Sequence, residues 1–236
     1  MGSFQHDTLH RAAVRIPADG LLLDGELEVP ARAKGLVIFA HGTGSGRLSP
    51  RNIMVAQRLR VHSLATLLVD LLSEDEEQDA EKRFDIDLLT ERLTAVTDWA
   101  RHDQLTGSLS FGYFGASTGA AAALTAAAYS DGDISAIVSR GGRVDLAGVP
   151  LKDVAVPTLL IVGQNDFGVL EVNEEAFLRL NGKKELSVIP RATHLFEEPG
   201  ALERVAILAA EWFNEYLGNG TDGTTNAGRI RSGDTP

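Results

Sequence analysis

The chain has 236 residues, a hydrophobic fraction of 44% and no cysteine, which suits one α/β domain and excludes disulfides, cysteine–zinc sites and a thiol nucleophile. A net charge of −11 argues against nucleic acid and anionic membranes as partners. No apolar run approaches the roughly 18 residues of a membrane span and the start carries no secretion signal, so we expect a cytoplasmic protein.

The first half of the chain predicts an antiparallel hairpin followed by buried strands that alternate with helices. Continuous apolar runs are typical of strands covered on both faces, and amphipathic repeats indicate helices. The acidic stretch 74–79 is expected to be a solvated loop or a short helix. The predicted strands are 11–16, 21–29, 35–40 and 64–69, and the predicted helices are 52–61 and 84–101.

The same alternation continues to residue 217 and predicts one α/β domain over residues 11–217. We expect a mostly parallel sheet of about eight strands with helices on both faces. About 18 residues separate the strands that end at 138 and begin at 157, too few for a large cap domain. Residues 1–10 are expected to be a flexible arm, and 218–236 a disordered tail. The predicted strands are 109–114, 134–138, 157–162 and 185–189, and the predicted helices are 120–128, 172–180 and 201–217.

A G-x-S-x-G motif, Gly115 to Gly119, lies between an apolar strand and an alanine-rich helix. This context is typical of a nucleophile elbow, in which a strained turn raises the serine hydroxyl above the sheet edge. Glycines on either side allow the strand and the helix to approach closely. The motif therefore predicts Ser117 as a nucleophile, although a chance match in a chain with 24 glycines is the alternative.

A serine nucleophile needs a base and an acid, which should follow later strands of a parallel sheet. Asp166 lies four residues past one such strand, and His194 follows the last strand. The resulting order Ser, Asp, His along the chain is the order that accompanies a nucleophile elbow of this kind. Asp145 and Asp153 are the alternatives for the acid. The remaining histidines lie in the N-terminal region, after helices or in the first glycine-rich loop, and none is well placed as the base: His6, His10, His41, His62 and His102.

The loop His41-Gly42-Thr43-Gly44 ends the strand that should precede the first sheet helix, and a loop at this place supplies the second oxyanion donor. We expect the N–H groups of Thr43 and Thr118 to form the oxyanion hole, with Gly42 as a second choice for the first donor. His41 is expected to orient the loop. A phosphate-binding glycine loop is the alternative, but no Gly-Lys-Ser/Thr follows and no G-x-G-x-x-G opens a helix.

Three arginines lie near predicted strand ends or in loops over the sheet. Arg83 and Arg140, and with them Arg143, are candidates to contact a substrate carboxylate, since arginine offers a planar fork of donors. Solvated charges that balance an acidic chain are the alternative. No cluster has metal-ligand spacing, and we expect neither a metal nor a cofactor.

These motifs together resemble the α/β-hydrolase superfamily, and the compact architecture is similar to its dienelactone-hydrolase-like branch. The resemblance covers residues 20–217 and rests on 41–44, 115–119, 162–166 and 193–196. Authentic dienelactone hydrolases use a cysteine nucleophile, which this chain lacks, and this departure favours a serine esterase.

The combined prediction is a serine hydrolase that cleaves carboxylic esters of small, water-soluble substrates through an acyl-enzyme. A thioesterase, a lactonase or an acyltransferase would use the same residues. A binding protein on a hydrolase scaffold is the alternative from another class, because a fold does not determine a function. The physiological substrate and the oligomeric state stay open.

Overall fold

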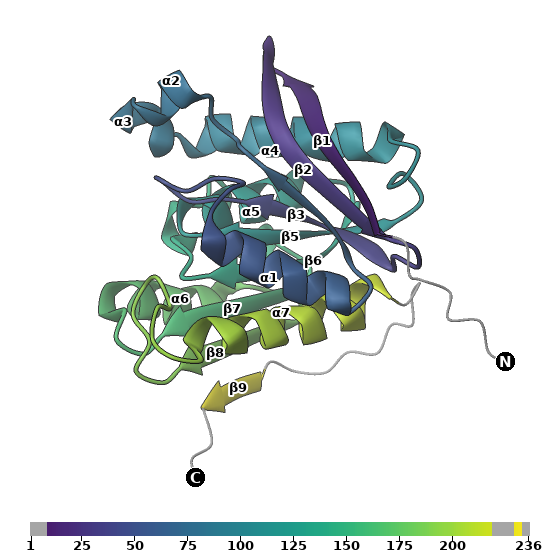
Figure 1. Ribbon diagram of the computed structural model, residues 1–236. Helices are drawn as coiled ribbons and strands as arrows, with labels where there is room; N and C mark the ends of the chain where they lie inside the picture. The colour runs from purple at the N-terminus through teal and green to yellow at the C-terminus, as the bar shows by residue number, and fades with distance from the viewer. Residues whose placement is uncertain (1–8, 219–228, 233–236) are drawn as a thin grey trace, which may run out of the picture.

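The computed structural model describes residues 9–218 and 229–232, which form a nine-stranded sheet with helices on both faces (Figure 1). The strand order is β1-β2-β4-β3-β5-β6-β7-β8-β9. Neighbours from β4 to β9 in this order pair in parallel, and β1 and β2 extend the sheet in antiparallel fashion. The strands are β1 (Leu9–Ala18), β2 (Leu21–Pro30), β3 (Gly35–Ala40), β4 (Ala65–Val69), β5 (Ser110–Ala116), β6 (Ile134–Arg140), β7 (Thr158–Gly163), β8 (Lys184–Ile189) and β9 (Arg229–Ser232).

The central strands are apolar and buried on both faces, as their continuous hydrophobic runs predict. Every residue of β3, β4 and β7 is buried. The rings of Phe39 in β3 and Phe114 in β5 pack with their centroids 4.9 Å apart. These strands are therefore covered on both faces, and their pairing confirms the predicted mostly parallel sheet.

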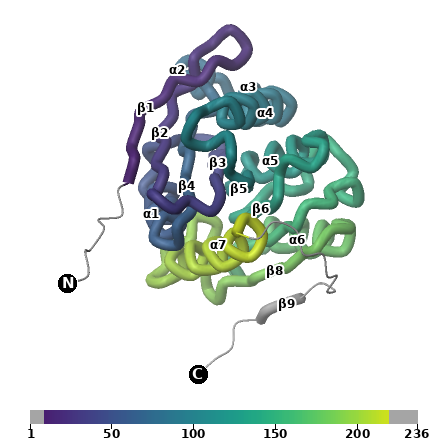
Figure 2. Tube along the Cα trace, turned by 90° about the vertical axis from the view of Figure 1, so that its right-hand side faces the viewer, coloured from purple at the N-terminus to yellow at the C-terminus, as the bar shows by residue number. Residues whose placement is uncertain are grey.

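The helices cover the sheet in two groups, which Figures 1 and 2 show from two directions. α1 and α7 pack together on one face, where α7 supplies a buried stripe that ends in Phe213 and Leu217. α4, α5 and α6 contribute to the core on the other face. The helices are α1 (Pro50–Val61), α2 (Glu74–Glu77), α3 (Ala80–Arg83), α4 (Ile86–His102), α5 (Thr118–Tyr129), α6 (Phe167–Arg179) and α7 (Ala201–Leu217).

The predicted N-terminal hairpin is present and begins two residues earlier than expected. Its two-residue turn consists of Asp19 and Gly20, both with positive φ (46° and 72°), which suits the twist of a tight hairpin. Leu9 and His10 belong to β1, not to a flexible arm, because they pair with the end of β2. Residues 1–8 of the predicted arm lie outside the described residues.

The segment between β6 and β7 contains two single 3-10 turns, Val144–Leu146 and Leu151–Asp153. The prediction that no large cap domain is inserted here is therefore confirmed. In contrast, α6 begins at Phe167, five residues before the predicted start. The Leu170 N–H donates to the Asp166 carbonyl at 2.8 Å, so the helix follows directly from the loop after β7.

The acidic segment after β4 forms the short helices α2 and α3 and is only partly solvated. Glu76 is buried and accepts hydrogen bonds from Arg92 of α4, whose side chain is also buried. An expectation of a wholly solvated acidic stretch is wrong at this residue, because the carboxylate has a buried counter-charge.

The expectation of a disordered tail is wrong for Arg229–Ser232, which form β9 in parallel register with β8. Without β9, the backbone groups of β8 on this side would be an unpaired sheet edge, and pairing satisfies them. The rest of the predicted tail, 219–228 and 233–236, lies outside the described residues.

Candidate active site

Ser117, the predicted nucleophile, lies in a strained turn between β5 and α5. Its backbone has φ 51° and ψ −121°, an uncommon conformation for a residue with a side chain. A Cβ on Gly115 would lie 2.5 Å from the Ala120 Cα, and one on Gly119 would lie 2.1 Å from the Ala40 carbonyl oxygen. Only glycine therefore fits on both sides of Ser117, as the elbow motif predicts.

Asp166 and His194, the predicted acid and base, contact each other although 28 residues separate them in the chain. The His194 Nδ1 lies 2.7 Å from the Asp166 Oδ2. The aspartate side chain is 14% exposed and the imidazole 39% exposed. With its Nδ1 proton donated to the carboxylate, a neutral imidazole has Nε2 free to accept a proton.

The end of β6 connects these two parts of the site. The Ser117 N–H donates to the Arg140 carbonyl at 3.3 Å. The next residue, Gly141, lies against the imidazole: a Cβ built on it would be 3.3 Å from the His194 Nδ1. Ser117, Asp166 and His194 thus follow β5, β7 and β8 at one edge of the sheet, with the end of β6 between them. Within the described chain, no hydrogen bond joins the Ser117 Oγ to His194.

The predicted oxyanion loop after β3 also reaches this edge. Gly42 packs so closely on the elbow that a Cβ there would lie 2.7 Å from the Ser117 Cβ. The Thr43 N–H donates to the Thr118 Oγ1 at 3.2 Å. Thr118 is the first residue of α5, where a backbone N–H has no partner within the helix. The two predicted donors are therefore neighbours, but the Thr43 N–H already has a side-chain partner.

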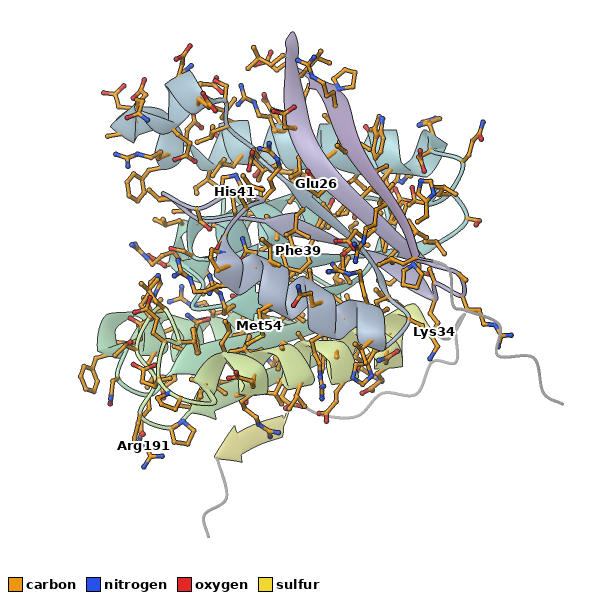
Figure 3. All side chains as sticks on the ribbon, in the orientation of Figure 1. Glu26, Lys34, Phe39, His41, Met54 and Arg191 are labelled. Atoms are coloured by element: carbon orange, nitrogen blue, oxygen red, sulfur yellow. The ribbon has the colours of Figure 1, made fainter. Side chains whose placement is uncertain are left out.

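His41 holds this loop in place through both ring nitrogens. Its Nε2 accepts the Leu71 N–H at 2.8 Å, and its Nδ1 lies 3.1 Å from the Gly42 carbonyl oxygen, to which it donates. Leu71 is held in turn by Arg92, whose Nη1 donates to the Leu71 carbonyl at 2.9 Å. In Figure 3, the labels of His41, which follows β3, and of Arg191, which follows β8, both lie on the left side of the view. The buried histidine therefore has the geometry of a loop anchor.

The three candidate arginines have different environments. Arg143 pairs with Asp145 at 2.7 Å, and this hydrogen bond raises the arginine's pKa. Arg83 has a buried Nε without a hydrogen-bond partner, and its carbonyl accepts the Thr43 hydroxyl at 3.2 Å. Arg140 is 7% exposed, and burial together with the nearby Arg51 lowers its pKa to about 10. Asp145, an alternative for the catalytic acid, is thus paired with Arg143 and not with His194.

A pocket of about 520 Å³ lies beside the predicted oxyanion loop. It is mainly polar, and the Glu77 Oε1 and the Ser49 Oγ in its lining are buried without hydrogen-bond partners among the described residues. Its position next to Gly44 makes it a candidate space for the polar part of a substrate. The lining residues are Gly44, Ser45, Gly46, Ser49, Glu77, Gln78 and Arg83.

Sequence reasoning did not single out four exposed apolar side chains in segments that follow strands of the sheet at their carboxyl ends. Their place after β3, β4, β7 and β8 is the only signal that was available. These residues, with their exposed fractions, are Leu48 (66%), Phe84 (54%), Phe167 (74%) and Leu195 (39%).

In the part of the chain that the structure describes, no group of three or more histidine or acidic side chains has the geometry to hold a metal ion. The described helices also include none with the length and apolar character to cross a membrane.

The structure resembles those of known hydrolases. A dienelactone hydrolase from Anabaena variabilis superposes with a TM-score of 0.85 and 52% identity, over 89% of this chain and 99% of that one. Est1E from Butyrivibrio proteoclasticus superposes with a TM-score of 0.73 over 86% of this chain and 98% of its own, and its 19% identity supports the fold alone.

Sequence comparison finds relatives with a different name. Two proteins from Mycobacterium tuberculosis strains, provisionally named phosphoribosyl transferases, are 52% identical over 204 residues, which is 86% of this chain. The match covers 46% of each relative, so this chain spans about half their length. A scan against models of protein families finds no match. The identity to a solved dienelactone hydrolase over nearly all of that chain places this chain in the α/β-hydrolase superfamily, in its dienelactone-hydrolase-like branch.

Proposed function

We propose that this protein is a serine hydrolase that cleaves carboxylic esters through an acyl-enzyme. The observation that carries the proposal is the hydrogen bond between Asp166 and His194 at the sheet edge where Ser117 occupies its strained turn. A strained nucleophile turn and an oriented imidazole at one edge are the parts that acyl transfer requires. Fold similarity to hydrolases adds support for the reaction class.

In the first half-reaction, the Ser117 Oγ attacks the acyl carbon while the His194 Nε2 accepts the hydroxyl proton. Asp166 keeps the Nδ1 proton in place and stabilises the imidazolium. The N–H groups of Thr118 and Thr43 donate to the tetrahedral oxyanion. The Thr43 N–H must first exchange its bond to the Thr118 hydroxyl for one to the oxyanion.

The intermediate then collapses, the bond to the alcohol breaks, and His194 gives its proton to the leaving oxygen. In the second half-reaction, His194 takes a proton from water, and the resulting nucleophile attacks the acyl-enzyme. The bond between the acyl carbon and the Ser117 Oγ then breaks, His194 returns its proton to that oxygen, and the acid leaves. Thioesters and lactones would follow the same course, and an alcohol in place of water would make the reaction an acyl transfer. Carboxylic esters of small molecules are our proposal for the substrate, in a cytoplasmic enzyme.

The name of the Mycobacterium tuberculosis relatives does not extend to this chain in our proposal. Those proteins are about twice as long as the matched region, and the matched region corresponds to the hydrolase fold described above. We infer that a transferase activity, where those relatives have one, belongs to their other half.

The test combines an active-site label with steady-state kinetics. A fluorophosphonate probe should label the wild type at Ser117 and leave Ser117→Ala unlabelled. Hydrolysis of p-nitrophenyl butyrate by that variant should fall by several orders of magnitude, because triad knockouts in a comparable enzyme lower kcat by about 10⁶. Asp166→Asn should be severe but milder, and His194→Ala combined with Ser117→Ala should be scarcely worse than either alone.

Ser108→Ala, at an exposed serine outside the candidate site, is the matched control and should keep wild-type activity. The proposed nucleophile would be contradicted if the probe labelled Ser117→Ala, or if this variant kept more than about one hundredth of the wild-type activity.

A further inference from the structure

Arg140 is a buried charge without an ionic partner. Its side chain leaves β6 at the carboxyl end, and the residue is 7% exposed. Nε and Nη1 are buried without hydrogen-bond partners, and no carboxylate of the described residues lies within ion-pair distance of the guanidinium. A buried cation is ordinarily paired, and buried unpaired donors are uncommon outside functional sites.

A second arginine adds to the positive charge at this place. Arg51, in the first turn of α1, is near enough for its charge to act on Arg140, and its own Nε is buried without a partner. Its Nη1 lies 3.5 Å from a carboxylate oxygen of Glu197, whose side chain is 67% exposed. One exposed carboxylate does not balance two guanidinium groups.

The N-terminus of α1, which carries Arg51, lacks a side-chain cap and begins with Pro50, which has no N–H to donate. Its first turn contains no acidic residue, and the Ser49 side chain makes no capping hydrogen bond. The Ser49 Oγ is buried without a partner. The positive end of a helix of 12 residues attracts negative charge, so it reinforces the field of the two arginines.

This cluster borders the candidate active site. The Arg140 carbonyl accepts the Ser117 N–H, and the guanidinium carbon lies 6.0 Å from the ring centroid of Phe196, two residues after His194. An anionic group held here would therefore belong to a molecule that also reaches the catalytic edge.

We propose that Arg140, with Arg51 and the N-terminus of α1, binds an oxyanionic group of the substrate, a carboxylate or a phosphate, so that esters with a second, negatively charged group are preferred. This inference rests on the proposed esterase function. The planar guanidinium can give two parallel hydrogen bonds to such a group, and charge-assisted bonds are about twice as strong as neutral ones. The small exposed fraction of Arg140 restricts the ligand to a compact group.

Matched pairs of esters test the proposal and locate the anion. p-Nitrophenyl hemisuccinate against p-nitrophenyl butyrate places the charge on the acyl part. 4-Acetoxybenzoate against its methyl ester places it on the alcohol part, and 4-acetoxyphenyl phosphate replaces the carboxylate by a phosphate. We expect kcat/KM of at least one charged ester to exceed that of its neutral partner, and we expect Arg140→Met to lower this ratio about tenfold or more.

Arg140→Lys should recover part of the ratio, since lysine keeps the charge but not the fork. Arg179→Met, which removes an exposed arginine from α6, is the matched control and should leave the ratio unchanged. A wild-type preference for the neutral ester in every pair, or a ratio that Arg140→Met does not change, would overturn the subsite while leaving the esterase function intact.

Direct binding separates failure of the subsite from failure of the proposed function. Succinate and inorganic phosphate are titrated into Ser117→Ala and into Ser117→Ala combined with Arg140→Met or with Arg140→Lys, with circular dichroism to confirm folding. Saturable binding by the first variant that is weakened about tenfold or more in a folded double variant supports the subsite even when no ester is hydrolysed. Absence of saturable binding by the first variant overturns it.

Discussion

Replacing Glu76 with glutamine should destabilise the fold by about 3–5 kcal/mol, because it leaves the buried Arg92 guanidinium with only the exposed Asp19 carboxylate, 4.0 Å away, as a counter-charge. Arg92 is 1% exposed and its Nη2 donates to the Glu76 Oε1 at 2.8 Å. The same carboxylate accepts the Ser73 N–H at 3.0 Å and the Lys82 ammonium at 3.1 Å. Glutamine keeps the shape but presents an NH₂ group, and no negative charge, to these donors.

The effect should depend on pH in a defined direction. Arg92 holds the pKa of Glu76 well below its usual range, whereas the unfolded chain titrates this carboxyl near about pH 4. The pair therefore contributes its full stability above about pH 5 and loses it progressively as the pH falls toward the lower folded-state pKa. The stability difference between the wild type and Glu76→Gln should be largest near neutral pH and should narrow in acid.

Thermal and urea unfolding at neutral and acidic pH measure the effect. For a chain of this length about 1 kcal/mol corresponds to roughly 2–4 °C, so Tm should fall by about 6–20 °C. Glu74→Gln, at an exposed position of the same short helix, is the matched control and should change stability by less than about 0.5 kcal/mol. Equal stability of the two variants at neutral pH would refute the argument that the ion pair anchors this segment.

Two further predictions concern the candidate site. Gly141→Ala should lower kcat/KM about tenfold or more, because the residue has φ 53° and its new Cβ would lie 3.3 Å from the His194 Nδ1. Gly132→Ala, with φ 91° and nothing within 4 Å of a Cβ, tests backbone strain without that contact, and an equal loss of activity in both variants would contradict the reasoning. With no large cap domain, kcat/KM for p-nitrophenyl esters from roughly two to sixteen carbons should favour short chains, since about 0.8 kcal/mol per buried methylene is gained only inside an apolar tunnel. A steady rise toward the longest chains would show that such a tunnel exists.

The fold and the predicted site residues came from patterns that act over short distances in the chain. Buried strands such as β3 and β7 are continuous apolar runs, and the elbow needs only a serine between two glycines at the junction of a strand and a helix. Asp166 and His194 could be paired because the carboxyl ends of parallel strands meet at one edge. The strands and the elbow depend on local sterics and on the periodicity of side chains, and the pairing of Asp166 with His194 depends on the general topology of a parallel sheet.

Other features depend on which side chains the packed chain brings together, and no local pattern reports them. Glu76 belongs to an acidic run that reads as solvated, and its burial follows from Arg92, 16 residues away on α4. Strand β9 forms because the edge of β8 has unpaired backbone groups, whereas its own sequence lies in a region that reads as a tail.

The same distinction holds for Arg140. Its sequence neighbours place it at the end of a strand, but they do not indicate whether the guanidinium lies in solvent, in an ion pair or beneath a loop. The packed chain buries the Arg140 side chain near Arg51 and Phe196, away from any described carboxylate. The free energy of a buried charge depends on every neighbour in three dimensions, and for that reason only the tertiary structure could identify this arginine as unpaired.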